Sequence, residues 1–496
     1  MIRIELLPGG KILEAKSGAR LRDLLFREGV EFPCGGRARC SRCRVRLLRG
    51  EWPPSDAETT LLSAKEVAEG WRLACQGLVS GPLTLELAQW EAPILADDTP
   101  FAFTPSEGLG IAIDVGTTTV AAQLLDLTSG EILSVATAFN AQGARGPDVM
   151  SRLEFALREG ATGLTETIRR QVGDIALDLL TKAARSSDDV RRVCLVGNTA
   201  MHHFFCALPI AQLAQDPFEP FSLAPREFSG SELGWNFRNA PISFLAPLGG
   251  FVGSDILAGI VATDLQRQQR PVALIDLGTN GEVVLAREGR VFCASTAAGP
   301  AFEGARISMG MRAATGAIHS VRRNQTGFHC EVFGGVAPRG ICGSGLVDAV
   351  ATGLESGVIA RNGRFTDGGA QWNLAAPVTL SQKDIRELQL AKAAIAAGLR
   401  TLMNEARVAD LDLIYLAGAF GNYINRQSAW RIGLIPSSPV NLIAAGNTAL
   451  LGAKLALFSD ANALVDEVIA KTVHVPLGGR VDFQEFFLEE MSFPAR

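Results

Sequence analysis

The sequence predicts a multidomain α/β protein in which a small β-rich unit at the N-terminus precedes a larger, duplicated, two-lobed body. Three observations support this fold class. The chain has 496 residues, more than one domain usually holds. A stretch rich in proline and acidic residues, 91–107, separates short alternating strands from apolar strands and alanine-rich helices, the texture of α/β domains. Two similar strand–turn–strand segments begin at Ile111 and Ala273, as expected for a duplicated fold.

These changes of texture divide the chain into four parts. We expect a cysteine-bearing domain at residues 1–90, a linker at 91–107, a first lobe with a middle domain at 108–260, and a second lobe at 261–496. Within the first part, period-two alternation predicts strands and leucines at helical spacing predict one helix. The strands are expected at Ile2–Leu7, Lys11–Ala15, Val45–Leu48 and Leu83–Leu87, and the helix at Arg20–Glu28.

The composition narrows the class of protein. A formal net charge of −5 gives no support for nucleic-acid binding. No apolar run approaches the roughly 18 residues of a membrane span, and the first residues alternate like a hairpin rather than a secretory signal. Nine cysteines, an odd number in a long chain, do not indicate a disulfide framework. We therefore expect a cytoplasmic protein that binds neither nucleic acid nor a membrane.

Four cysteines near the N-terminus have the spacing of a metal site. Five residues separate Cys34 from Cys40, two separate Cys40 from Cys43, and 31 separate Cys43 from Cys75. Three thiolates in one loop and a distant fourth can hold a 2Fe–2S cluster. A structural zinc site usually has two C-x2-C pairs, and only one is present. We therefore predict these four as ligands of a 2Fe–2S cluster in a β-grasp, ferredoxin-like domain. Its five-residue gap resembles the adrenodoxin branch rather than plant-type ferredoxins.

Arginines surround this cluster of cysteines. Their positive charge would favour the reduced state and offer a surface to an acidic partner, or it would simply form a solvated face. The six arginines are Arg37, Arg39, Arg42, Arg44, Arg46 and Arg49.

The two repeated segments carry a phosphate-binding pattern. Asp114 and Asp276 each end an apolar strand, and each precedes a glycine turn with hydrogen-bond donors. The N–H groups of such turns bind phosphate oxygens, and carboxylates that retain water suit Mg²⁺. We therefore expect the two aspartates to hold Mg²⁺ between them. No Walker-type P-loop motif is present, which disfavours the P-loop class. The expected phosphate-binding residues are Gly116, Thr117, Thr118, Thr119, Gly278, Thr279, Asn280 and Gly281.

These motifs resemble the acetate and sugar kinase, heat-shock chaperone and actin superfamily (ASKHA), whose body has two ribonuclease H-like lobes. The resemblance implies an actin-like ATPase in which Asp114 and Asp276 are catalytic. It also implies that Leu416–Gly421 is the adenosine motif, where Gly418, Ala419 and Gly421 admit ATP. The segment Gly340–Asp348 would be a further nucleotide-lobe or connecting element, or simply a site of tight helix packing.

The fusion of the two modules resembles the reductive activators of corrinoid-dependent enzymes, the RACE family. Longer segments carry this resemblance: Asn140–Arg152, Val196–His203, Pro217–Pro220, Gly250–Asp255 and Gly446–Ala453. It implies ATP-dependent one-electron reduction of inactive Co(II) to Co(I) in the corrinoid protein of a methyltransferase system. It further implies an electron donor such as a flavoprotein reductase, and a homodimer.

Three other interpretations stay open: an ATP-independent ferredoxin serving a monooxygenase, a sugar or small-molecule kinase, and a chaperone or scaffold ATPase for corrinoid protein assembly. The adjacent His202 and His203 either pack in a core or reach a metal or the cobalt. The remaining cysteines have no cluster spacing and are expected to be buried small hydrophobes. They are Cys194, Cys206, Cys293, Cys330 and Cys342.

Overall fold

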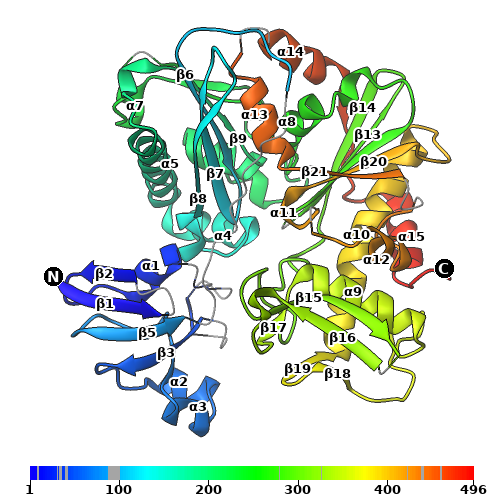
Figure 1. The fold of residues 1–496 in the computed structure, drawn as a ribbon. Helices are drawn as coiled ribbons and strands as arrows, with labels where there is room; N and C mark the ends of the chain where they lie inside the picture. The colour runs from blue at the N-terminus through cyan, green and yellow to red at the C-terminus, as the bar shows by residue number, and fades with distance from the viewer. Residues whose placement is uncertain are drawn as a thin grey trace.

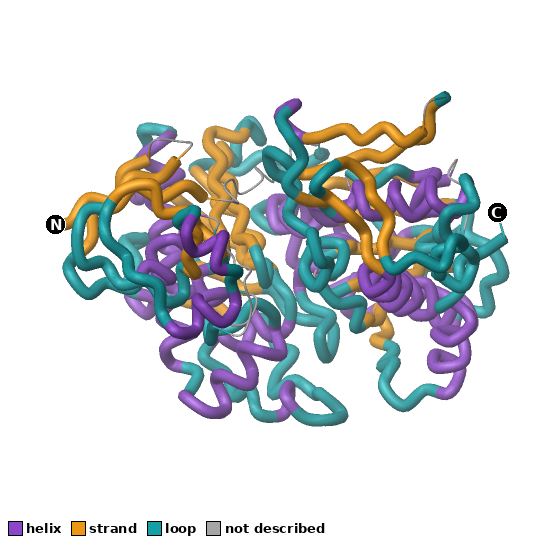
Figure 2. Tube along the Cα trace, turned by 90° about the horizontal axis from the view of Figure 1, so that it is seen from below, coloured by secondary structure: helices purple, strands orange, loops and turns teal. Residues whose placement is uncertain are grey.

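The computed structural model describes residues 1–7, 11–28, 30, 32, 36–38, 43–87, 101–238, 240–278, 280–325, 327–421, 423–436, 441–458 and 461–495. Two large α/β lobes stand side by side, the N-terminal domain lies below the first lobe, and a smaller subdomain lies below the second (Figure 1). Seen from below, the N-terminal domain and this subdomain are neighbours (Figure 2).

The N-terminal domain is a mixed five-stranded sheet in the order β2-β1-β5-β3-β4. Its strands are β1 Ile2–Leu7, β2 Lys11–Ala15, β3 Arg44–Arg49, β4 Trp71–Leu73 and β5 Leu83–Leu87. β1 pairs with β5 in parallel, and the helix between them buries Leu21 and Leu25 on the sheet, the arrangement expected of a β-grasp domain. The expected helix is shorter than predicted, because α1 Leu21–Leu25 gives way to a 3₁₀ turn, η1 Phe26–Glu28. Capping boxes begin α2 Asp56–Leu61 and α3 Ala64–Ala68.

The first lobe contains a six-stranded sheet in the order β10-β11-β9-β6-β7-β8. The strands are β6 Leu109–Val115, β7 Thr119–Asp126, β8 Ile132–Phe139, β9 Val190–Val196, β10 Arg226–Phe228 and β11 Ile242–Phe244. The helices are α4 Val149–Glu159, α5 Thr162–Lys182, α6 Thr199–Cys206 and α7 Gly230–Leu233. One face of the sheet packs against α4, α5 and α6 in a single apolar core.

The second lobe repeats this plan with the order β21-β20-β12-β13-β14-β22. Its strands are β12 Val272–Leu277, β13 Gly281–Arg287, β14 Arg290–Thr296, β20 Leu413–Ala417, β21 Leu442–Gly446 and β22 Thr472–His474. Its helices are α10 Gln382–Glu405, α11 Gly418–Gly421, α14 Ala461–Lys471 and α15 Val481–Glu490. In both lobes three strands form an antiparallel meander whose first strand is parallel to a later one. The predicted duplication is therefore confirmed.

Two helices, α8 Ser254–Ala262 and α13 Thr448–Leu455, pack between the two sheets (Figure 1). They contact at Gly452, where an added Cβ would overlap the Ala258 backbone. Because α8 spans 260/261, the expected division between the lobes falls inside a helix. The first ten residues of the expected linker lie outside the described residues, and the rest has no helix or strand. It is packed rather than free, since Phe103 lies 4.7 Å from the Phe458 ring.

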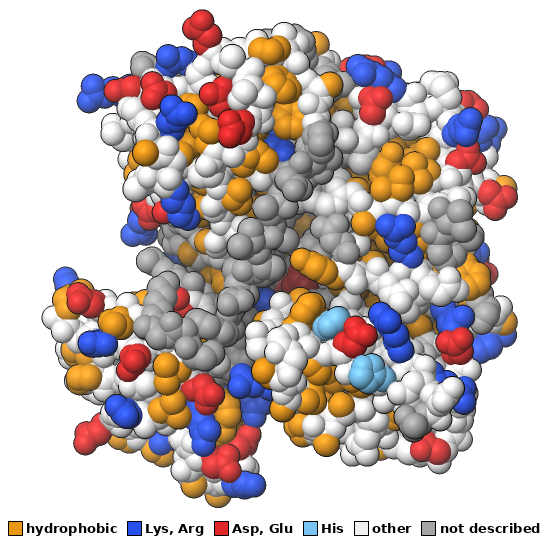
Figure 3. All heavy atoms as spheres, in the orientation of Figure 1, with side chains coloured by type: hydrophobic (Ala, Val, Ile, Leu, Met, Phe, Trp, Pro, Cys, Tyr) orange, Lys and Arg blue, Asp and Glu red, His pale blue; other side chains and the backbone are white. Residues whose placement is uncertain are grey.

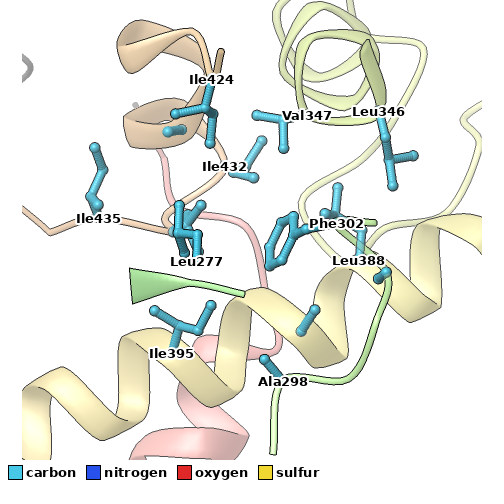
Figure 4. Close-up of a cluster of buried hydrophobic side chains, with 14 of the residues drawn as sticks. Leu277, Ala298, Phe302, Leu346, Val347, Leu388, Ile395, Ile424, Ile432 and Ile435 are labelled. Atoms are coloured by element: carbon cyan, nitrogen blue, oxygen red, sulfur yellow. The ribbon is translucent and has the colours of Figure 1, made fainter. Parts of the chain in front are cut away.

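The lower subdomain of the second lobe joins a small sheet to a buried helix. It comprises β15 Ala317–Asn324, β16 Gly327–Val332, β17 Gly340–Ile341, α9 Gly343–Glu355, β18 Gln371–Ala375, β19 Val378–Ser381 and α12 Arg426–Arg431. Added Cβ atoms at Gly343 and Gly345 would overlap backbone carbonyls of neighbouring segments, so Gly340–Asp348 is a site of tight helix packing. Figure 4 shows Leu277, Phe302, Val347 and Ile395 in the apolar core that this subdomain shares with β12 and α10 of the second lobe. No helix in the described part of the chain is long and apolar enough to span a membrane.

Candidate cluster and nucleotide sites

The described half of the cysteine site fits a soft metal centre. Cys43 directly precedes β3 and Cys75 follows β4, and the antiparallel pairing of these strands brings the two thiols together. The Ala74 N–H donates to the Cys43 carbonyl at 2.9 Å. A hydrogen bond between the thiols lowers the pKa of Cys75 to about 6, helped by the Gln76 side chain. A thiolate at neutral pH is the form that binds iron. Cys34 and Cys40 lie outside the described residues.

A buried carboxylate, that of Glu58, holds in place the strand that leads to Cys75. Glu58 has no exposed surface, and its side chain accepts hydrogen bonds from the Leu73 N–H at 2.6 Å and the Ser55 N–H at 2.7 Å. It therefore ties α2 to the strand that leads to Cys75, and its charge works against the lowering of the Cys75 pKa. We did not predict Glu58 as a site residue. Its signal in the sequence is the Ser55-x-x-Glu58 capping box, which marks the start of a helix.

The arginines near the cysteines are partly neutralised within the chain. Arg44 pairs with Glu66 at 2.7 Å and lies 5.8 Å from the Trp71 ring centroid. Arg46 lies 3.8 Å from Glu86. Arg37 reaches Glu154 of the first lobe at 4.0 Å, and Arg39 and Arg42 lie outside the described residues. The described part of this face thus offers less free positive charge than the sequence suggested.

The first predicted phosphate turn is a tight hairpin held from outside. The Gly116 N–H donates to the Thr119 carbonyl at 3.1 Å. Asn140 clamps the turn from the end of β8: its side-chain amide donates to the Gly116 carbonyl at 2.8 Å and its N–H to the Thr118 carbonyl at 2.9 Å. The carbonyls are thereby turned toward protein donors.

Two further side chains fix Thr117 in this turn. The fully buried Arg152 donates to the Thr117 carbonyl at 2.6 Å. The amide of Asn198, the N-cap of α6, donates to the Thr117 hydroxyl oxygen at 2.7 Å. Because a hydroxyl can accept and donate at the same time, the Thr117 hydroxyl can still donate its proton to a phosphate. Asn140, Arg152 and Asn198 were not predicted individually, although each lies in a segment that carried the family resemblance.

The second predicted turn and the predicted adenosine motif meet at one point. Asp276 pairs with Ala417 in the parallel strands β12 and β20. Gly418 follows with φ +83°, and an added Cβ would stand 2.7 Å from the Asp276 Oδ1 atom. Only glycine accommodates both this backbone angle and this approach. Gly278 and Asn280 lie in the turn, Gly281 begins β13, and Ala419 and Gly421 lie in α11, whereas Thr279 lies outside the described residues.

Two acidic residues join the predicted pair between the lobes. Asp255 stands in the first turn of α8, its N–H 3.4 Å from the Gly197 carbonyl. Glu282 is buried on β13, directly after the second turn. Neither was predicted as a site residue, although each closes a segment that the sequence singled out, GFVGSD and ALIDLGTNGE. The side-chain amide of Asn447 donates to Asp114 at 3.2 Å. The space-filling view shows a hollow between the lobes with acidic atoms at its depth (Figure 3).

Burial raises the pKa of all four carboxylates, and neighbouring negative charges add to the rise for Asp114, Asp255 and Glu282. Burial, and then the charge of Asp276, raise the pKa of Asp114 to about 7. Burial and the charges of Asp114 and Asp276 raise the pKa of Asp255 to about 8. Burial alone raises the pKa of Asp276 to about 6. Burial, with the charges of Asp255 and Asp276, raises the pKa of Glu282 well above its usual value. A bound cation would relieve this repulsion.

The described residues contain no set of three His, Cys, Asp or Glu side chains arranged to coordinate a metal by themselves. Mg²⁺ does not require such a set, because it usually keeps several waters and binds through one or two carboxylates and the phosphates of its nucleotide. The donors around Asp114 and Asp276 fit that mode of binding.

The paired histidines belong to the core of the first lobe. His202 and His203 are both fully buried in α6. The His203 Nδ1 atom lies 2.8 Å from the Thr199 carbonyl, and the His202 ring meets Phe244 edge-on at 5.1 Å. Burial, with the charges of His203 and Arg226, lowers the pKa of His202 to about 3. These contacts fit the packing interpretation. Of the remaining cysteines, Cys330 is half-buried, while Cys194, Cys206, Cys293 and Cys342 are buried.

Family models match three successive stretches of the chain. Residues 4–80 match the family model of the 2Fe-2S iron-sulfur cluster binding domain. Residues 109–268 match the "RACo middle region", and residues 270–496 match the "C-terminal domain of RACo the ASKHA domain".

Named relatives agree with these family matches. A corrinoid activation enzyme of Eubacterium limosum is 36% identical over 77% of this chain and 70% of its own length. A [Co(II) methylated amine-specific corrinoid protein] reductase of Methanosarcina barkeri is 29% identical, over 77% of each chain. The solved structure of a reductive activator for corrinoid, iron-sulfur protein matches with a TM-score of 0.69 and 25% identity, over 100% of this chain and 98% of that one. The chain therefore belongs to the RACE family of reductive activators, with a 2Fe–2S binding domain at its N-terminus and an ASKHA domain at its C-terminus.

Proposed function

We propose that this protein uses ATP to reduce the inactive Co(II) form of a corrinoid protein to Co(I), by one electron, and so returns a corrinoid methyltransferase to its cycle. The observation that carries the proposal is the union, in one chain, of a paired-thiol site and a two-lobed nucleotide site with four interacting carboxylates. The relatives named for corrinoid activation and Co(II) reduction support the same reaction.

In this proposal the N-terminal domain carries the electron. Cys34, Cys40, Cys43 and Cys75 would hold the 2Fe–2S cluster, which when bound supplies one-electron transfer. The described pair contributes a thiol pKa low enough for thiolate ligation at neutral pH. Glu58 would keep the strand before Cys75 in place through its bond to the Leu73 N–H.

The body would bind the nucleotide. The clamped turn at Gly116–Thr119 would direct to phosphate oxygens the Thr117 hydroxyl and those backbone N–H groups other than that of Gly116, which already donates to the Thr119 carbonyl. Asp114 and Asp276 would hold hydrated Mg²⁺ from the two lobes. Asp255 would orient the attacking water, since a carboxylate with a pKa near neutrality suits that role. Gly418, Ala419 and Gly421 would admit the adenosine.

The energies are compatible with such coupling. Tenfold in a one-electron equilibrium corresponds to about 59 mV. Plant-type clusters have potentials near roughly −400 mV, so a deficit of about 100 mV to the Co(II)/Co(I) couple would cost on the order of 2 kcal/mol. Coupling free energies between two ligand sites are typically about 1–3 kcal/mol, which covers that deficit.

The test is an anaerobic assay with the full chain, a Co(II) corrinoid protein, a reductant and Mg²⁺–ATP, monitored by the Co(I) absorption band. We expect reduction that requires ATP and is lost in Cys43→Ser and in Asp276→Asn. Cys330→Ser, which changes a half-buried cysteine of the second lobe, is the matched control and should retain activity.

The same assay separates the other interpretations. An ATP-independent ferredoxin would reduce its partner equally well without nucleotide. A scaffold ATPase for corrinoid protein assembly would still work as Cys43→Ser. A sugar kinase would consume ATP only when a sugar is supplied.

We propose several finer assignments with this function. The four parts of the chain would be residues 1–90, 91–107, 108–260 and 261–496. The electron donor would be a flavoprotein reductase, and the active form a cytoplasmic homodimer. Sedimentation of the purified holoprotein would test the homodimer. Reconstitution of the reaction with a purified flavoprotein reductase would test the electron donor.

A further inference from the structure

Residues of the N-terminal domain and of both lobes line one pocket. This cavity of about 160 Å³ is lined by Phe26 and Phe32 from the N-terminal domain, by Thr118 and Arg152 from the first lobe, and by Arg312 from the second. Phe32 lies two residues before the predicted ligand Cys34, and Thr118 belongs to the predicted phosphate turn. A residue close in sequence to the predicted cluster ligands and a residue of the predicted phosphate turn therefore line the same cavity.

The contact with the first lobe is apolar and shape-dependent. The Phe26 ring lies 6.5 Å from the Phe139 ring. It also lies so close to Gly143 in η2 Ala141–Ala144 that an added Cβ would overlap it. One ion pair, Arg37 with Glu154 at 4.0 Å, accompanies this contact.

The contact with the second lobe is made at a separate place. Glu86, on β5 of the N-terminal domain, lies 4.0 Å from Arg339. Arg312 of the second lobe also reaches across, with its guanidinium 4.2 Å from the centroid of the same Phe139 ring that Phe26 approaches. The N-terminal domain thus touches both lobes at the mouth of the cleft between them.

Phe139 connects this junction to the phosphate turn. The next residue, Asn140, is the one whose side chain and N–H clamp the Gly116 and Thr118 carbonyls. A phosphate that adjusts the turn would act on Asn140, and hence on the surface against which Phe26 packs. Any change in the angle between the lobes would also have to alter the contact with Phe139 or the one with Arg339.

We propose that docking of the N-terminal domain on this three-way junction and nucleotide binding in the cleft oppose each other. The docked domain holds the two lobes at their present angle, and nucleotide-driven closure displaces it. The proposal rests on the proposed function, since it takes the cleft as a nucleotide site. Beyond that function, it assigns Phe26, Phe139 and Gly143 to the contact that controls docking of the N-terminal domain. By linkage, docking weakens nucleotide binding by the same factor by which bound nucleotide weakens docking, so a variant that docks less well should bind nucleotide more tightly.

The test measures the affinity of the full-length holoprotein for a Mg²⁺-bound, non-hydrolysable ATP analogue by titration calorimetry. Gly143→Ala weakens docking from the body and Phe26→Ala weakens it from the N-terminal domain. Gly163→Ala is the matched control, since its Cβ would have ordinary contacts with Arg145, the nearest at 3.7 Å. We expect each docking variant to bind the analogue about fivefold tighter or more, and the control to bind like the unaltered protein.

A double variant guards against local damage by either substitution. Because both changes remove one contact, Phe26→Ala with Gly143→Ala should bind the analogue as tightly as either single variant, not more tightly. Amide hydrogen exchange at Ala141–Ala144 should rise in the unaltered protein when the analogue binds. Unchanged or weaker affinity in both single variants would overturn the coupling and leave the proposed function standing. An unaltered protein that binds no nucleotide would overturn both.

Discussion

Replacing Gly418 by alanine tests the nucleotide site at its narrowest point. The substitution has two separable costs. At φ +83° an L-residue is strained by about 1–2 kcal/mol. In addition, the new Cβ would stand 2.7 Å from Asp276 Oδ1 and 3.0 Å from the Leu277 carbonyl, where ordinary contact begins at 3.4 Å.

The second cost reaches the predicted magnesium ligand. The Asp276 carboxylate would have to move by roughly 0.7 Å, and misplacement of a reacting group by about 1 Å costs on the order of 100-fold in rate. We therefore expect ATP hydrolysis to fall about 10- to 100-fold. Gly357→Ala is the matched control, because Gly357 has φ +73° but nothing within 4 Å of its added Cβ.

Both variants should lose stability in urea unfolding through the shared backbone strain, and Gly418→Ala should lose more because its Cβ also overlaps Asp276 and Leu277. Only Gly418→Ala should lose ATP turnover, measured as phosphate release with Mg²⁺ and the reduced holoprotein. If the two variants hydrolyse ATP at the same rate, Asp276 does not act where we place it, and the assignment of the second turn fails.

Four further predictions follow from burial and charge. In the apo-protein, iodoacetamide should modify Cys75 at pH 7 before Cys293, because their pKa values are about 6 and about 12; equal rates would contradict the paired-thiol geometry. The raised pKa values of the three site aspartates mean that their contribution to stability is complete below the unfolded value of about 4 and is lost as pH rises through about 6 to 8. The Tm of the apo-protein should therefore fall between about pH 5 and pH 8, and Asp276→Asn should flatten that slope; a Tm that rises with pH would refute it. Glu58→Gln removes a buried negative charge near Cys75 and should raise the reduction potential in an EPR-monitored titration, whereas an unchanged potential would limit Glu58 to a structural role. His202→Phe should keep ATP-dependent Co(II) reduction, because the ring packs edge-on in an apolar core; loss of activity in a folded variant would revive a metal or cobalt role.

The sequence predicted the strands and turns of the site because their signals are local. A buried strand, an aspartate and a glycine turn are contiguous, so Asp114 and Asp276 could be placed at the ends of β6 and β12 from periodicity alone. The duplication was visible for the same reason.

The supports of the site could not be predicted in this way, because they come from segments distant in the chain. Asn198 reaches Thr117 across 81 residues, and Asn447 reaches Asp114 across 333. Asp255 became visible as a site residue only when α8 was placed between the two lobes. The carboxylates beside Arg37, Arg44 and Arg46 could not be predicted for a related reason, since a sequence shows a cation but not the carboxylate that the fold sets beside it.

The strength of the junction decides whether docking can be reversible. Its two carboxylate–arginine contacts are both 4.0 Å long and partly exposed, and such pairs contribute about 0–1 kcal/mol each. The Phe26 ring is partly buried already within its own domain. Full burial of such a side chain stabilises a protein by about 1.5–3 kcal/mol, so docking contributes only a part of that free energy. The total is comparable to the about 1–3 kcal/mol that one bound ligand can exert on a second site. A docking free energy much larger than this range would keep the N-terminal domain on the body even when nucleotide is bound. One far smaller would leave the domain undocked without nucleotide, so that nucleotide binding could not displace it.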